Sequence, residues 1–221
     1  MADINKPTYN ASTGKYAWNI DDVDVVVDRS NDVENNAPEE TAGWDDLRFP
    51  LEATKKIASK EPVDTEYKGG VVLAFEDTAD EGISFLAQTP HIRENGTDMR
   101  PHLHIALPTA GSGVGAENIK FDLTYSWAKI GYAFPTETTT SFTVDVQDYS
   151  ADTHYLIEFD DDILFSNQAN DGNDGVSSML ICSCFRDVSI ANNYDDDVYV
   201  LELDFHYKID QPRGSREETT K

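Results

Sequence analysis

Basic side chains are scarce in this chain. Seventeen lysine and arginine residues stand against 42 aspartate and glutamate residues, which gives a formal net charge of −25 over 221 residues. A surface with this excess of negative charge repels the phosphate backbone, because non-specific affinity for nucleic acids comes from lysine and arginine side chains that neutralise phosphates. We therefore expect no nucleic acid among the partners of the protein.

Cysteine and long apolar stretches are also rare. No apolar run approaches the roughly 18 residues that a membrane-spanning helix needs, and the first residues lack the basic start and apolar core of a signal peptide. The two cysteines, Cys182 and Cys184, are separated by one residue, which is too close for easy disulfide geometry within one strand. No second pair of ligands accompanies them, as a structural zinc site would require. The sequence predicts buried free thiols and no membrane partner.

Segments with strand-like alternation fill most of the chain. Threonine, valine, tyrosine and phenylalanine are frequent in them, and turn-forming glycine and proline lie between them. The expected strands are 70–76, 83–89, 102–107, 119–129, 139–146, 155–159, 178–186 and 198–209. Eight antiparallel strands predict an all-β, two-sheet sandwich of the jelly-roll type, with an immunoglobulin-like sandwich as the alternative. The residues expected in or near its core are Phe75, Phe85, Leu103, Phe121, Tyr125, Phe142, Leu156, Leu180, Leu201, Leu203 and Phe205.

The first 43 residues differ from the rest. They are polar and acidic, and their one strand-like piece is Trp18–Asp28, followed by a linker-like stretch over 29–43. We expect residues 1–43 to form an extended arm, and residues 44–221 to form the β domain, entered through a short helix or turn near Leu51–Lys56 and closed by a short tail. The arm has too few apolar residues to fold alone, so its contacts should lie mainly between chains. Its expected anchors are Trp18, Val25, Val26 and Val27.

The main candidate for chemistry is the pair His102 and His104 in the segment RPHLH. Alternation places both imidazoles on one face of a strand, about 6–7 Å apart at the backbone, a spacing that two ligands of one metal often use. The favoured interpretation is a pair of histidines hydrogen-bonded within the sheet or at a subunit interface, with no cofactor. The alternative is a divalent-metal site at His102 and His104, completed by His91, Asp98 or His206.

Other polar groups give weaker indications of a functional site. His206 shares a strand face with Asp204, whose carboxylate could orient the imidazole. Three acidic clusters, at 160–162, 170–175 and 195–197, could supply oxygen ligands to calcium or could simply be solvated loops. No serine or cysteine nucleophile occupies a recognisable elbow, so we expect no hydrolytic triad and no enzyme.

Two resemblances add to these patterns. Gly96, followed after five residues by His102-x-His104, resembles the first motif of the cupins, although Pro108 and Thr109 stand where that motif has a glutamate and the second motif is missing. The segments WDDLRFP, RPHLH, SSML…FRD, DFHYKID and GSREE, spread over 44–221, resemble a family of tailed-bacteriophage virion proteins. That resemblance implies that the protein belongs to a phage particle, but it identifies no catalytic residues.

The phage-like segments and the acidic charge together predict a non-enzymatic virion protein, assembled in the host cytoplasm. Because a strongly acidic surface suits solvent better than packaged DNA, we expect a decoration protein on the outer capsid, with the neck, tail or fibre as alternatives. A cupin-like metal enzyme using His102 and His104 is the second alternative. The expected partners are further copies, as a homotrimer, and the major capsid protein or other virion proteins. Arg213 and Arg216, in the C-terminal tail, are expected at these contacts.

Overall fold

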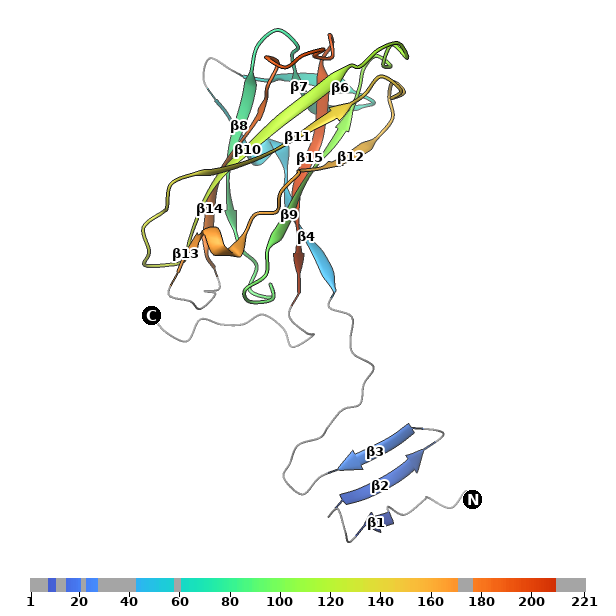
Figure 1. Cartoon of the computed structure of the whole chain (residues 1–221), viewed down its shortest axis with the longest axis vertical. Helices are drawn as coiled ribbons and strands as arrows, with labels where there is room; N and C mark the ends of the chain where they lie inside the picture. Colours follow the sequence, from blue (N-terminus) through green and yellow to red (C-terminus); the bar gives the residue numbers. More distant parts are fainter. Residues whose placement is uncertain are drawn as a thin grey trace. The chain divides into compact units, whose positions relative to one another are not determined.

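A computed structural model describes residues 8–10, 15–20, 23–27, 43–57, 61–170 and 177–209 (Figure 1). The chain forms two compact units, Met1–Thr41 and Ala42–Lys221. The dividing point lies two residues before the boundary expected from composition. None of the helices in the described part of the chain is long and apolar enough to cross a lipid bilayer.

The first unit contains a three-stranded antiparallel sheet. Its strands are β1 (Thr8–Asn10), β2 (Lys15–Ile20) and β3 (Val23–Val27), in the order β1-β2-β3. The sequence predicted one strand over 18–28 within an extended arm, and this was wrong, because the run divides into two strands that pair with each other. Two aspartates, residues 21 and 22, separate these strands in the sequence, and aspartate favours turns over strand interiors.

The second unit is an all-β sandwich of two six-stranded sheets, which confirms the predicted fold class. The first sheet, called the β10 sheet below, has the order β11-β10-β14-β8-β5, with β13 pairing in parallel with β10. Its strands are β5 (Lys55–Lys56), β8 (Glu81–Gln88), β10 (Asn118–Ala128), β11 (Thr138–Asp145), β13 (Gln168–Ala169) and β14 (Met179–Arg186).

The second sheet, the β15 sheet, has the order β12-β9-β15-β7-β6, with β4 also pairing with β15. Its strands are β4 (Trp44–Phe49), β6 (Val63–Tyr67), β7 (Gly70–Phe75), β9 (Met99–Ala106), β12 (Tyr155–Glu158) and β15 (Val198–Lys208). Two 3-10 turns, η1 (Leu51–Ala53) and η2 (Phe165–Asn167), complete the described elements. Strand β15 is central, since β9 pairs along one of its edges while β7 and β4 pair with successive parts of the other.

The core lies between the two sheets and is rich in aromatic rings. Phe75 of the β15 sheet packs edge-on against Phe121 of the β10 sheet, with ring centroids 5.3 Å apart. Phe49 contacts both Phe85 and Phe205, at 4.7 and 4.8 Å. Burying such side chains away from water is the main favourable contribution to the stability of a sandwich of this kind.

Two predicted core residues lie elsewhere. Leu156 is 46% exposed because Ile157 is the buried neighbour in β12, and Leu156 pairs with His104 on the opposite face of the sheet. Leu201 is only partly buried, because the register of β15 against β9 shifts between Val200 and Glu202. Such a bulge interrupts the alternation on which the prediction depended. The other nine predicted core residues are buried.

Candidate functional site

Polar side chains gather on the face of the β15 sheet that points away from the core. In β9, Leu103 and Ile105 are fully buried in the core, so His102 and His104 point to the other face. Strand β15 lies beside β9 (Figure 1), and its register places Asp204 opposite His102 and His206 opposite Arg100. Alternation in both strands therefore sends these histidines and the carboxylate to the same face.

Six residues form what we call the histidine cluster. Strand β4 adds Asp46, opposite His206, and the segment before β12 adds His154. The cluster consists of Asp46, His102, His104, His154, Asp204 and His206. It contains four of the five histidines in the chain.

His102 and Asp204 make the buried centre of the cluster. They are 2% and 3% exposed, and His102 Nε2 lies 2.5 Å from Asp204 Oδ1. This contact is close enough for an ion pair, but Oδ1 receives no hydrogen bond of good geometry. His104 Nε2 lies 3.6 Å from the other carboxylate oxygen, Oδ2. One buried carboxylate thus faces two imidazoles.

The remaining members surround this centre. His206 Nε2 lies 2.7 Å from Asp46 Oδ1, and its ring centroid lies 4.1 Å from that of His102. His104 Nδ1 lies 2.6 Å from His154 Nε2, and these two rings are stacked. The four imidazoles therefore form a continuous group in which each ring contacts at least one other.

Burial and charge act differently on the two central imidazoles. Burial is the largest influence on His102 and opposes its charged form, but contact with the Asp204 carboxylate outweighs it and raises the pKa of His102. For His104, burial is again the largest influence, and the neighbouring histidines add to it, so the pKa of His104 is lowered despite Asp204. The pKa values of the two central imidazoles are therefore shifted in opposite directions.

The donor atoms fit a metal ion of the first transition series. Within the described residues, two groups of three have ligand atoms that all lie within 4.8 Å of one another: His102, His104 and Asp204, and Asp46, His102 and His206. Imidazole nitrogen with carboxylate oxygen is a ligand set that Zn²⁺ uses, and two histidines with one carboxylate also bind non-haem Fe²⁺. The two groups share His102, so one ion could occupy either group.

Charged and aromatic side chains border the cluster. Arg48 donates two hydrogen bonds to the carboxylate of Glu202, each of 2.5 Å. The Arg100 guanidinium lies 4.8 Å from the ring centre of Trp44, over which Lys208 also lies, at 5.7 Å. These basic groups offset part of the negative charge on an otherwise acidic surface.

The structure brings some of the predicted site residues together and not others. His102, His104 and His206 meet in the cluster, as the sequence proposed for a metal site. His91 instead lies 2.5 Å from the Ser177 hydroxyl, and the Asp98 carboxylate accepts a hydrogen bond from the Phe165 amide, so neither belongs to the cluster.

Three members of the cluster were not predicted as ligands. Asp204 could have been found, because it alternates with His206 in one strand. Asp46 and His154 had no signal in the sequence, since their approach depends on which strands pair. Of the predicted interface residues, Trp18 and Val25–Val27 lie in β2 and β3, and Arg213 and Arg216 lie outside the described residues.

The other candidate ligands do not form a site within the described residues. Cys182 and Cys184 are free and buried on the core face of β14, as predicted, and burial raises the pKa of both thiols. The acidic segments 160–162 and 195–197 contribute to neither group of potential metal ligands. The third segment, 170–175, lies almost wholly outside the described residues.

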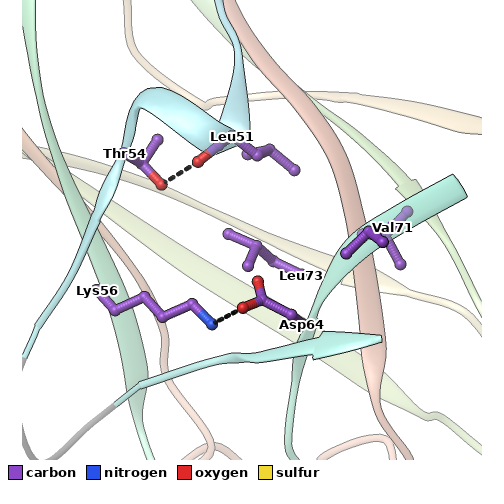
Figure 2. Close-up of a pocket in the computed structure, with 7 residues that line it drawn as sticks. Leu51, Thr54, Lys56, Asp64, Val71 and Leu73 are labelled. Atoms are coloured by element: carbon purple, nitrogen blue, oxygen red, sulfur yellow. Dashed lines mark hydrogen bonds and ion pairs between the residues drawn. The ribbon is translucent and has the colours of Figure 1, made fainter. Parts of the chain in front are cut away.

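A hollow of about 440 Å³ lies beside η1, β5, β6 and β7 (Figure 2). Apolar side chains and one ion pair line it: Leu51, Thr54, Lys56, Asp64, Val71, Val72 and Leu73. Lys56 Nζ lies 2.8 Å from Asp64, and the Thr54 hydroxyl donates to the Leu51 carbonyl. Each polar side chain in this hollow thus has a partner within the chain, and no histidine, cysteine or serine lines it. We find no catalytic group there.

No protein-family model and no curated protein matches this sequence. Among solved structures, the chain is similar to CBM28, a carbohydrate-binding module specific for non-crystalline cellulose, at 11% identity and a TM-score of 0.35, over 72% of this chain and 86% of that one. It is similar to a family 11 carbohydrate-binding module from Clostridium thermocellum at 16% identity and a TM-score of 0.30, over 76% and 90%. The structure of infectious bursal disease virus, Gx strain, gives 11% identity and a TM-score of 0.30, over 88% and 41%. These similarities concern the β-sandwich fold alone.

Proposed function

We propose that the protein is a non-enzymatic structural protein of a tailed-phage particle and that it decorates the outer surface of the capsid. The observation that carries this proposal is the division of the chain into a complete sandwich and a separate unit, Met1–Thr41. A unit of this size rarely supports a stable core of its own, because chains below about 40 residues usually need disulfides, metals or a partner. The unit has no cysteine. It therefore needs a surface against which to pack.

The pairing inside the first unit identifies the residues that would dock. Trp18 of β2 lies opposite Val25 of β3 in the register, and the next pair is Asn19 with Asp24. An aromatic residue beside β-branched residues is the composition of an interface anchor. Such an anchor suits a small module that docks on another subunit.

The phage-like segments lie next to one another in the sandwich. WDDLRFP contains β4, RPHLH belongs to β9 and DFHYK ends β15, and these strands are neighbours in the β15 sheet. Segments far apart in the sequence thus build one surface, which supports a shared role for them. The net charge of −25 favours a solvent-facing position over contact with packaged DNA.

The enzymatic alternative has less support. A catalytic metal site needs room for a substrate beside its open coordination position, and two of the candidate ligands, His102 and Asp204, are almost completely buried. The hollow in Figure 2 is lined by other residues. A cupin-like activity at His102 and His104 would therefore need a substrate path that the described hollow does not supply.

Particle incorporation tests the proposal. Phage carrying the full-length protein with Trp18→Ala and Val25→Ala should assemble with strongly reduced amounts of it on the outer capsid, as measured by quantitative protein analysis and by microscopy of labelled particles. The matched control is Asn19→Ala with Asp24→Ala, the next pair in the register of the same two strands, which should incorporate normally. Density confined to the tail or neck would replace decoration by those alternatives, and absence of the wild-type protein from particles would refute a virion role.

Oligomeric state provides a second measurement. We propose a homotrimer, since a sandwich with a docking module can close a threefold ring on a capsid lattice. Sedimentation of the purified full-length protein should give the mass of three chains. A monomer at all concentrations up to those in the infected cell would contradict the trimer.

A further inference from the structure

We propose that His102, His104 and Asp204 bind one divalent transition-metal ion, with Zn²⁺ as the best match to the donor set. The inference goes beyond the proposed structural function and does not depend on it, since a virion protein and any other β-sandwich could both carry such an ion. Its basis is the geometry of adjacent strands, where β9 supplies both imidazoles and β15 supplies the carboxylate.

The buried carboxylate is the first argument. Asp204 is 3% exposed, and its Oδ1 atom lies 2.5 Å from His102 Nε2 without hydrogen-bond geometry. Burying a carboxylate is costly unless it is paired or coordinates a metal, and an ion between this carboxylate and the imidazoles would supply that compensation. The donor atoms of His102 and His104 face this carboxylate, at 2.5 and 3.6 Å.

The distances suit one ion after a small adjustment. Ligand atoms about 2.0–2.1 Å from a tetrahedral Zn²⁺ are separated from one another by about 3.4 Å. The 3.6 Å between His104 Nε2 and Asp204 Oδ2 already has this length. The 2.5 Å between His102 Nε2 and Asp204 Oδ1 is shorter than this by less than an ångström, so the two groups must separate slightly when an ion binds.

Interactions behind the ligands hold the rings in place. Metal-binding histidines almost always engage their second ring nitrogen in a hydrogen bond, which fixes the tautomer and the orientation. His104 Nδ1 lies 2.6 Å from His154 Nε2, so its Nε2 is left to coordinate. His102 likewise has a hydrogen bond with the backbone of Arg100. Both imidazoles therefore have a second interaction of the kind that orients metal-binding histidines.

The competing group, Asp46 with His102 and His206, is less suitable. Asp46 and His206 have side chains 43% and 37% exposed and already contact each other at 2.7 Å. Both side chains are therefore partly solvated and contact each other without an ion. His104, whose side chain is 18% exposed, leaves a solvent-accessible side through which an ion could enter the preferred group and a water could complete its coordination.

Metal binding to the full-length protein tests the site. The metal-stripped protein is titrated with Zn²⁺, and with Co²⁺ as a spectroscopic probe, and metal retained after desalting is counted. We expect one tightly held equivalent, visible ligand-field absorption from Co²⁺, and a melting temperature about 5–10 °C higher when free Zn²⁺ is about a hundredfold above its dissociation constant.

Variants separate this site from weak binding to surface carboxylates. Asp204→Asn and His104→Gln should each lose the retained equivalent and the Co²⁺ absorption, and circular dichroism would show that both remain folded. His91→Gln is the matched control, because this fifth histidine lies outside the cluster, and it should bind like the wild type. The conservative His104→Gln covers the case in which Asp204→Asn fails to fold.

The results that overturn the proposal are equally specific. Retention of less than a tenth of an equivalent by the folded wild-type protein would refute a metal site. Equal retention by the wild type and by His104→Gln would also refute it, since the metal would then lie elsewhere. Loss in His206→Gln together with retention in His104→Gln would assign the ion to the competing group. None of these results bears on particle incorporation, so the two proposals fail independently.

Discussion

Arg186, at the end of β14, offers the sharpest test of how the sandwich is held together. Its side chain is fully buried, and it donates hydrogen bonds to three backbone carbonyls, those of Phe75, Tyr194 and Asp196, at 2.7–2.9 Å. Phe75 ends β7 in one sheet, while the other two carbonyls belong to the segment that leads into β15. Arg186 thus fastens a connecting loop to both sheets.

Replacement of Arg186 with methionine keeps most of the volume and removes all three donors. A hydrogen bond to a charged group contributes about 1.5–3 kcal/mol, so three of them amount to roughly 5–9 kcal/mol. Part of this is offset, because burial opposes the guanidinium charge and lowers the pKa of Arg186, and because its Nε atom has no partner. We therefore expect a net loss of about 3–5 kcal/mol, which is the range for breaking a buried charged contact.

Urea denaturation, followed by circular dichroism and by tryptophan fluorescence, measures this loss. With a slope of about 3 kcal/mol per molar urea, the unfolding midpoint should fall by about 1–2 M. Arg48→Met is the control, because the Arg48 side chain is 67% exposed and its ion pair with Glu202 is solvated, so its midpoint should stay close to that of the wild type. A loss below about 1 kcal/mol for Arg186→Met would show that water or loop movement satisfies the carbonyls, and would refute the reasoning.

Two further predictions concern ionisable groups away from the histidine cluster. The hydrogen bond from Lys120 and those from Ser189 lower the pKa of Asp187 to about 2, so its stabilisation is complete above about pH 4 and is lost as the pH falls through 2. Asp187→Asn should therefore lower the free energy of unfolding by about 1–2 kcal/mol at pH 7, allowing for partial screening, and leave it unchanged near pH 1.5. Denaturation measured at both pH values checks this, and an equal loss at both would contradict the assignment. Cys182 and Cys184 should be unreactive towards a thiol reagent at pH 8 in the folded protein, because burial raises the pKa of both thiols, and should react at once in urea; rapid labelling of the native state would show that β14 opens.

Local alternation explains why much of the fold was predictable. All eight expected strands are present, from β7 to β15, because each has apolar residues at a period of two over several residues. Strand β4 was missed because Asp45 and Asp46 interrupt its apolar pattern, and it is a strand only through its pairing with β15. The bulge after Val200 was equally invisible, since a bulge is a property of a strand pair and not of one strand.

The candidate site was predictable only where it depends on alternation within a single strand. That His102 and His104 share a face follows from alternation within β9, and that Asp204 and His206 share a face follows from alternation within β15. The two pairs of residues lie on the same face of one sheet only because β9 pairs with β15. The paired residues of these strands are about a hundred positions apart in the sequence. No local pattern encodes such a pairing, and the contribution of His154 depends on a third strand, β12.

The position of the cluster on β15 also determines how rigid it is. Asp204 and His206 flank Phe205, which is fully buried and packs against Phe49 of β4 at 4.8 Å. Leu203 is buried on the same core face, directly opposite Leu103 of β9. The residues on the core face therefore fix the strands whose other face carries the imidazoles and the carboxylate. A site held in this way is organised before any ligand arrives. Its side chains lose their conformational entropy when the sandwich folds, so little further entropy is lost when an ion binds. Binding of an ion at His102, His104 and Asp204 would in turn link β9 to β15 at the centre of the sheet. Because β4 and β7 both pair with the other edge of β15, this link would also stabilise their positions.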